Sequence, residues 1–371
     1  MNPEKQKLDN LTIVRFFAAF AVFMLHGGAV FTNSTAIPIW FKNMISHGGE
    51  GVTIFFVLSG FILSYNYHGK LVNSTFKFKS YFTNRFARVY PMYLFALIVG
   101  IPFMISHAKF LGISYGLPYL ATDTVSRIFL LHAWYPYFND HPHWLTQGWT
   151  LSVELLFYVS FPFLLRGIEA AKKFVVPIWV ICILLSWLPR MLILNQLGDS
   201  GEPWVQQFPL LRLPEFLVGI CSFYVYNLAR INTKLMPILQ YGAMAALLII
   251  LAQSFNYVQS PLTLGCVMAS SLLIIGLAGH TATGEPNALR KAFIFLGEAS
   301  YSLYLIHGFT ILIVYKSMDR VLKTDAENTF LAFFICLVVT IIASGLCYRF
   351  IEEPARRWIR KKSAPVAPSS L

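Results

Sequence analysis

The sequence predicts an all-α fold, a polytopic membrane helix bundle with about ten transmembrane helices. Of its 371 residues, 56% are hydrophobic and only 12% are charged, whereas soluble proteins carry about 25% charged residues. Hydrophobic runs of about 18 or more residues recur along the chain, which is the length that an α-helix needs to cross a bilayer. The segments of a membrane β-barrel would alternate over about ten residues, so a barrel is excluded.

The net charge of +12 is explained by the membrane rather than by nucleic acid, because the cytoplasmic loops of membrane proteins are rich in Lys and Arg. We therefore expect membrane lipid, and no nucleic acid, among the partners. The five cysteines lie within apolar segments and show neither paired nor metal-ligand spacing, so we interpret them as packing residues and expect no metal. They are Cys182, Cys221, Cys266, Cys336 and Cys347.

The apolar runs and their polar flanks define the expected spans. In order, these are 11–31, 50–67, 88–107, 148–166, 174–194, 208–228, 235–253, 260–279, 292–315 and 328–350. Most of the 29 Lys and Arg residues then fall on one side, which the positive-inside rule makes cytoplasmic together with both termini. The polar residues 1–10 precede a full-length span without a small-residue cleavage site, so the first helix is expected to be retained.

Residues 108–147 fit this pattern least well, because their apolar run, Ile128 to Trp134, is short. If that run crossed the membrane, every later loop would change sides. We therefore expect a re-entrant or surface-lying segment on the outer side, a candidate lid or acceptor channel. Residues 1–358 are expected to form one membrane domain, and residues 359–371, with Pro365 and Pro368, a disordered cytoplasmic tail.

Arg15 and His26 are ionisable residues inside the first expected span, where such side chains are costly and usually functional. At about 100° per residue, the helix makes about three full turns between them, so both lie on one face, about 16 Å apart along the axis. An arginine at this depth needs a partner. The pair therefore marks the two ends of a candidate site.

Helix rise places three ionisable groups in an outer layer, about 20 Å above the inner surface. These are His26, Glu154 and His307. Histidine can act as a base near neutral pH, and a carboxylate such as Glu154 can orient it. Two other interpretations remain open. An interhelical ion pair alone would account for Glu154, and His307 shares an i, i+4, i+7 stripe with Ser300 and Tyr304 that can simply hydrogen-bond between helices.

An inner layer contains Arg15, Arg85 and Arg88. Arg85 and Arg88 are spaced i, i+3 and project from one helix face, and a planar guanidinium suits phosphate. The lysines nearby, Lys70, Lys77 and Lys79, are equally compatible with topology signals or lipid-headgroup contacts. A separate feature is the pair Gly51 and Gly60 in the second span, which predicts close helix packing.

Six motifs occur in a fixed order along the chain. They are Arg15 and His26 with ten residues between them, Phe55-Phe56-Val57-Leu58-Ser59-Gly60-Phe61, Arg85-Phe-Ala-Arg88 followed by Tyr90-Pro91, Trp149-Thr150-Leu151-Ser152-Val153-Glu154, the stretch Ser300 to His307, and Glu353-Pro354. In these motifs the chain resembles acyltransferase family 3 of bacterial membrane enzymes, from Leu11 to about Trp358.

The resemblance implies transfer of an acyl group, usually acetyl, from cytoplasmic acyl-coenzyme A to a hydroxyl at or beyond the outer face of the bacterial plasma (inner) membrane. The functional positions it implies are Arg15, His26, Arg85, Arg88 and Glu154. The candidate supporting residues are Trp149, Ser152, Tyr301, Tyr304 and His307. Some members carry a C-terminal hydrolase-like domain; none is visible before Leu371, so a stand-alone type is expected.

This resemblance suggests a mechanism. The coenzyme A phosphates would bind Arg85 and Arg88, with Arg15 as a further candidate, and the acyl thioester would reach His26. His26, positioned by Glu154, would remove a proton from the acceptor hydroxyl. The acceptor remains open among O-antigen, capsule, exopolysaccharide, a lipid-linked sugar, a signalling oligosaccharide and a small hydrophobic natural product.

Two other functions are compatible with intramembrane Arg, His and Glu. A multi-pass transporter of a sugar or other small solute would use such residues for substrate and proton pathways, although the two halves of the chain show no convincing similarity. A sensor or assembly scaffold would tolerate replacement of both Arg88 and His26.

Overall fold

The computed structural model is a helix bundle with no β-strand in the part of the chain it describes. The structure describes residues 8–111, 116–135, 144–230, 232, 234–254, 260–279, 285–323 and 325–363. The α-helices are α1 (Asp9–Gly27), α2 (Ala29–Asn33), α3 (Ile39–Ser46), α4 (Glu50–Val72), α5 (Phe78–Leu111), α6 (Leu117–Ile128), α7 (Trp149–Ala170), α8 (Val175–Leu185), α9 (Leu188–Leu197), α10 (Glu202–Gln207), α11 (Pro209–Ala229), α12 (Leu235–Ala252), α13 (Leu262–Gly279), α14 (Ala288–Glu298), α15 (Ser300–Leu322), α16 (Phe330–Cys347) and α17 (Glu353–Ser363).

The described helices confirm a multi-pass membrane protein. Seven helical stretches are long and apolar enough to span a bilayer, and the pair α3 and α4, bent by 50°, would make an eighth. These stretches overlap eight of the ten expected spans. The other two, 208–228 and 292–315, correspond to α11 and to α14 with α15, which do not meet the same test.

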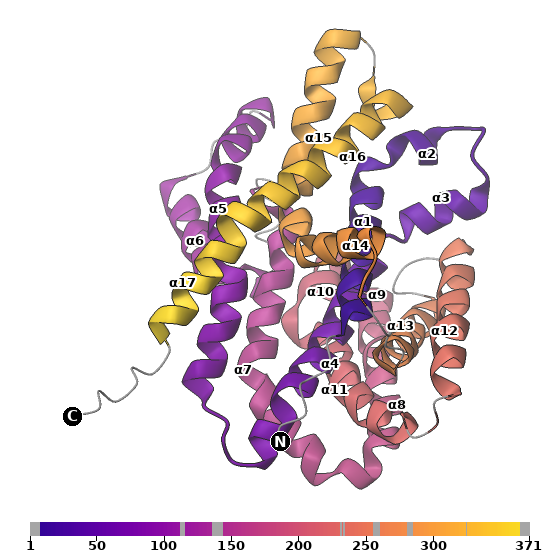
Figure 1. The fold of residues 1–371 in the computed structure, drawn as a ribbon. Coiled ribbons are helices and arrows are strands. Elements are labelled where there is room, and N and C mark those ends of the chain that lie inside the picture. Colours follow the sequence, from indigo (N-terminus) through magenta and orange to yellow (C-terminus); the bar gives the residue numbers. More distant parts are fainter. Residues whose placement is uncertain are drawn as a thin grey trace.

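The expected span 292–315 is divided into two helices at Ala299. Figure 1 shows α14 lying at an angle to α15, which runs beside α16. Gly297 and Glu298 interrupt the apolar run at this break, but a single span was expected because apolar residues continue on both sides. A π-helix, η7 (Tyr348–Glu352), then joins α16 to α17, and α17 packs against α5 (Figure 1).

The described parts of 108–147 pack against α5 and α7. Tyr93 Oη donates a hydrogen bond to the backbone oxygen of Arg127 (2.9 Å), and Trp144 Nε1 donates to that of Leu97 (2.7 Å). Arg127 is itself buried and paired with Asp123 (2.8 Å). Residues 112–115 and 136–143 of the expected re-entrant segment lie outside the described residues, as do residues 364–371 of the expected tail. Residues 359–363 continue helix α17.

Glycines set the close crossings of α4, as the sequence predicted. A Cβ atom at Gly51 would lie 2.3 Å from the backbone oxygen of Ala18 on α1. A Cβ atom at Gly60 would lie 2.2 Å from the backbone oxygen of Phe216 on α11. Helix α4 is therefore held between α1 and α11, and this arrangement brings the polar residues of several helices together.

Candidate functional site

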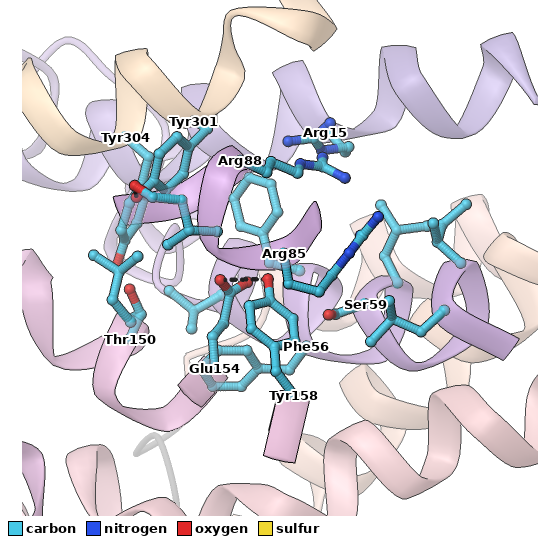
Figure 2. A pocket seen from close by; sticks show the side chains of 17 residues that line it. Arg15, Phe56, Ser59, Arg85, Arg88, Thr150, Glu154, Tyr158, Tyr301 and Tyr304 are labelled. Carbon is cyan, nitrogen blue, oxygen red and sulfur yellow. Dashed lines mark hydrogen bonds between the residues drawn. The ribbon is translucent and has the colours of Figure 1, made fainter. Parts of the chain in front are cut away.

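Three arginines from two helices surround one cavity, which we call the arginine cavity. Arg15 comes from α1, and Arg85 and Arg88 come from one face of α5. The cavity has a volume of about 90 Å³ and is also lined by Glu154 and Tyr158 of α7. Figure 2 shows these side chains arranged around the same space. The structure thus brings together all three arginines of the expected inner layer.

The guanidinium groups of this cavity have no carboxylate at ion-pairing distance among the described residues. Nε of Arg85 is buried without a hydrogen-bond partner there. Three arginines and one carboxylate, Glu154, give the lining a formal excess of two positive charges. Arg85 is buried, and Arg15 and Arg88 are half-buried. Cations gathered in this way favour a bound anion, and the guanidinium fork suits phosphate oxygens.

Glu154 accepts a hydrogen bond from Tyr158 Oη (2.9 Å), which Figure 2 marks with a dashed line. A second carboxylate, Glu352 of the π-helix, is buried, accepts a hydrogen bond from Ser302 Oγ (2.7 Å) and interacts electrostatically with Arg88 and Arg15. Both carboxylates therefore lie beyond ion-pairing distance of the arginines but still interact with them electrostatically. Neither Tyr158 nor Glu352 was among the sequence candidates.

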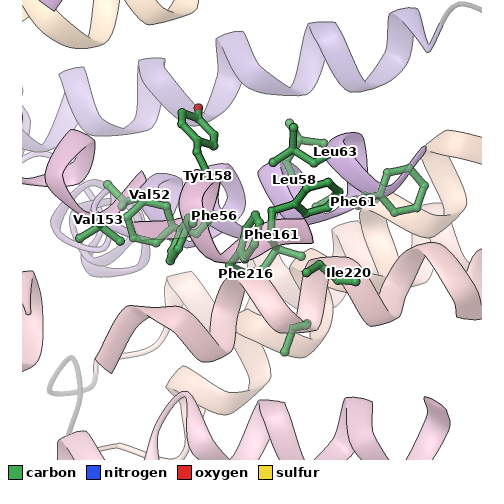
Figure 3. Packing of buried hydrophobic residues seen from close by; sticks show 14 of the residues in the cluster. Val52, Phe56, Leu58, Phe61, Leu63, Val153, Tyr158, Phe161, Phe216 and Ile220 are labelled. Carbon is green, nitrogen blue, oxygen red and sulfur yellow. The ribbon is translucent and has the colours of Figure 1, made fainter. Parts of the chain in front are cut away.

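Aromatic rings form the apolar side of the arginine cavity. Phe56, which lines the cavity, meets Phe157 edge to face with ring centroids 5.1 Å apart. Phe157 in turn stacks on Phe216 at 4.5 Å. Figure 3 shows the apolar side chains of α4, α7 and α11 meeting here, among them Phe161. The apolar lining lowers the local dielectric constant, so electrostatic interactions in the cavity are stronger than at a protein surface.

A second cavity, which we call the histidine cavity, contains His26. It has a volume of about 390 Å³ and lies between the end of α1, the start of α4 and the start of α7. The exposed ring of His26 stacks on the buried ring of His307, with centroids 5.3 Å apart and planes 25° apart. His307 Nδ1 donates to the backbone oxygen of Tyr304 (2.7 Å), because a carbonyl can only accept. Nε2 of His307 is left as the acceptor nitrogen in the neutral ring.

The two cavities are neighbours. Val52 of α4 and Tyr304 of α15 line both of them. Tyr304 Oη makes a long hydrogen bond to the backbone oxygen of Gln147 (3.5 Å). A group bound at the arginines would pass these two side chains to reach His26.

The structure does not place Glu154 beside His26. Glu154 lines the arginine cavity, whereas His26 lines the histidine cavity. The carboxylate that shares a cavity with His26 is Glu50, together with the guanidinium of Arg212. Neither residue was among the sequence candidates, although Arg212 and Glu215, spaced i, i+3 inside an expected span, were a signal for a buried ion pair.

The supporting candidates divide between the two cavities. Trp149 lines the histidine cavity, where the guanidinium of Arg212 lies over its ring at 5.7 Å. Tyr301 lines the arginine cavity and donates to the backbone oxygen of Val89 (2.7 Å). Ser152 lines neither cavity; it is buried and donates to the backbone oxygen of Leu130 (2.5 Å).

Arg190, Arg212 and Glu215 form a fully buried charge network behind the histidine cavity. Glu215 Oε1 lies 3.3 Å from Arg190 Nη1 and 3.2 Å from Arg212 Nη1. This network fixes the guanidinium of Arg212 at the cavity wall. The described residues contain no group of three or more His, Cys, Asp or Glu side chains arranged to hold a metal ion.

Comparison with known proteins finds similarity along nearly the whole chain. Residues 8–349 match the model of a family described as an acyltransferase domain. The chain is 28% identical to acyltransferase MdmB of Streptomyces mycarofaciens over 394 residues, covering 99% of this chain and 97% of that relative. It is 21% identical to the O-acetyltransferase OatA of Staphylococcus aureus (strain NCTC 8325 / PS 47) over 378 residues, covering 94% of this chain but only 57% of OatA.

No solved structure matches the chain significantly. The family match extends over nearly the whole chain and includes both cavities. The chain therefore belongs to acyltransferase family 3, and it is a membrane acyltransferase.

Proposed function

We propose that the protein is an O-acetyltransferase of the bacterial plasma membrane. It transfers the acetyl group of acetyl-coenzyme A to a hydroxyl of a carbohydrate acceptor, such as a cell-surface polysaccharide or a lipid-linked sugar. The observation that carries this proposal is the cluster of Arg15, Arg85 and Arg88, whose guanidinium groups have no ion-pair partner among the described residues. The name of the relative OatA supports the choice of O-acetyl transfer.

The arginine cavity is the donor end of the site in this proposal. The phosphates of acetyl-coenzyme A bind the guanidinium groups, which lie on the side that the basic loops make cytoplasmic. The pantetheine arm extends past Val52 and Tyr304, because these residues separate the arginine cavity from the histidine cavity. Glu154 and Tyr158 belong to this donor end and help to position the arginines.

The histidine cavity is where the acyl group is transferred. His26 accepts the proton of the acceptor hydroxyl, and the hydroxyl oxygen forms a bond to the thioester carbonyl carbon. Collapse of the tetrahedral intermediate breaks the carbon–sulfur bond, and the proton goes to the departing thiolate of coenzyme A. His307, stacked on His26, holds the ring in place.

The test uses acetyl-coenzyme A labelled in the acetyl group, with membranes that contain the protein and surface glycans from the host. We expect label to move to a glycan, and mass spectrometry to locate the acetylated hydroxyl. The His26→Ala variant should remain in the membrane and transfer no label, since a positioned general base contributes about 10² to 10⁴ in rate. Full transfer by this variant, or movement of an intact solute without label transfer, would refute the proposal.

A further inference from the structure

The acceptor end of the site contains a buried carboxylate, that of Glu50, whose oxygens accept no hydrogen bond of normal geometry from the described residues. Glu50 begins α4, lines the histidine cavity and is only 2% exposed. Neither of its carboxylate oxygens has a hydrogen-bond partner of normal geometry among the described residues, although Thr53 approaches it from the next turn. Buried carboxylates without partners are costly, so such a group calls for an explanation.

Backbone packing holds Glu50 in this position. Gly48 and Gly51 lie on either side of it. A Cβ atom at Gly48 would lie 2.1 Å from the backbone oxygen of Ala21 on α1, and a Cβ atom at Gly51 would lie 2.3 Å from that of Ala18. The start of α4 therefore lies directly against α1, the helix that carries His26. Glu50 and His26 consequently line the same cavity from adjacent helices.

The charge of Glu50 is balanced within the protein, although its hydrogen bonds are not. Glu50 interacts electrostatically with Arg190, Arg212 and Glu215. Two carboxylates thus face two guanidinium groups, and the nearer contacts of both arginines are made to Glu215. A cationic ligand would leave this group with a net positive charge, whereas neutral hydroxyl groups would satisfy the carboxylate and leave the charge balanced.

We infer that Glu50 is the residue that recognises the acceptor, by accepting a hydrogen bond from a hydroxyl next to the one that is acylated. The inference rests on the proposed function and specifies it further: the acceptor presents at least two neighbouring hydroxyls, as a sugar ring does. One hydroxyl faces His26 and the other donates to Glu50. Gln206, which lines the same cavity, adds an amide group for a further hydroxyl.

The experiment tests whether the Glu50 side chain and one particular hydroxyl of the acceptor contribute to the same interaction. The probe is the sugar unit found acetylated in the labelling experiment, prepared as its methyl glycoside, with each of its monodeoxy analogues. For the unaltered protein, one analogue should lose about tenfold or more in kcat/KM, because a hydrogen bond to a charged group is lost. In the Glu50→Gln variant, kcat/KM for the parent glycoside should fall by a similar factor. For the same analogue, kcat/KM in this variant should be no lower than for the parent glycoside.

Controls separate recognition from folding. The KM for acetyl-coenzyme A should not change in Glu50→Gln, because Glu50 does not line the arginine cavity. If Glu50→Gln fails to fold, Glu50→Asp keeps the charge and should show the same coupling. Glu169→Gln is the matched control: Glu169 lines neither cavity and already accepts hydrogen bonds from His68, Lys172 and Tyr224.

The outcomes are distinct. Absence of label transfer by the unaltered protein would refute the proposed function itself. If label is transferred, but the loss of kcat/KM caused by Glu50→Gln multiplies with the loss caused by every monodeoxy analogue, the two changes are independent. That result would overturn the role of Glu50 and leave the proposed function standing. So would an equal coupling in Glu169→Gln.

Discussion

The imidazole rings of His26 and His307 stack with their centroids 5.3 Å apart, and they belong to helices α1 and α15. The contact is made through the ring faces, while Nδ1 of His307 is occupied by the backbone oxygen of Tyr304. His307 is buried and His26 is exposed to the cavity. His307 is therefore a positioning residue, and His26 is the ring that can meet a substrate.

The first prediction follows from this stacking. His307→Phe keeps a flat ring against His26 and should retain kcat within about threefold, whereas His307→Ala removes the ring and should lower kcat about tenfold or more, because a misplaced catalytic group loses rate steeply. Steady-state kinetics with labelled acetyl-coenzyme A measures both. Equal and complete inactivation by both changes would instead mean that His307 itself carries a proton.

The second prediction concerns the donor end. Arg88→Lys keeps the charge but removes the planar fork that binds two phosphate oxygens. We expect the KM for acetyl-coenzyme A to rise about tenfold while the KM for the acceptor stays the same, because Arg88 lines only the arginine cavity. Arg320→Lys, at an exposed position near the end of α15, is the control and should change neither value. A rise in the acceptor KM with no change for the donor would contradict the assignment.

Much of the fold was predictable because long apolar runs in the sequence indicate membrane-spanning helices directly. Eight of the ten expected spans overlap helical stretches that are long and apolar enough to cross a bilayer. The helix period also placed Arg15 and His26 on one side of α1, and the structure gives each of them a cavity. The other two expected spans do not meet this criterion of length and hydropathy. Helix α11 carries the buried charges Arg212 and Glu215, and the last of the two is divided between α14 and α15.

The partner of His26 could not be predicted in the same way. Counting residues from the end of a span gives a distance along one helix, but not the tilt, offset or rotation of that helix against its neighbours. This is why Glu154 was expected beside His26 and is instead found with the arginines. Glu50 was missed because its place depends on the tight crossing of α4 with α1 at Gly48 and Gly51, a long-range contact.

The third prediction tests the helix crossings with two glycines of α4. Gly60→Ala would place a Cβ atom 2.2 Å from the backbone oxygen of Phe216, and we expect the free energy of unfolding to fall by about 1–3 kcal/mol, as for other overpacked sites. A Cβ atom at Gly69 would meet nothing within 4 Å, so Gly69→Ala should stabilise the helix by about 0.5–1 kcal/mol. Thermal unfolding in detergent should give opposite shifts, and shifts of the same sign would contradict this packing.

The fourth prediction tests whether the acyl group passes between the two cavities. Val52 lines both cavities, so Val52→Phe would fill the space between the arginines and His26. We expect kcat for acetyl transfer to fall at least tenfold while the KM for acetyl-coenzyme A changes little, because the phosphate-binding arginines are untouched. Val52→Ala widens the same passage and should keep activity, with better use of longer acyl donors such as propionyl-coenzyme A.

A matched change away from the passage distinguishes blocking from a general effect of added volume. Val176 of α8 is 48% exposed, so Val176→Phe adds the same atoms on the outside of the bundle and should leave kcat unchanged. Overpacking of this kind costs about 1–3 kcal/mol, and size-exclusion chromatography in detergent shows whether the Val52→Phe variant remains folded. A folded Val52→Phe protein with full kcat would mean that the acyl group reaches His26 by another route, because Val52 and Tyr304 are the residues that line both cavities within the described structure.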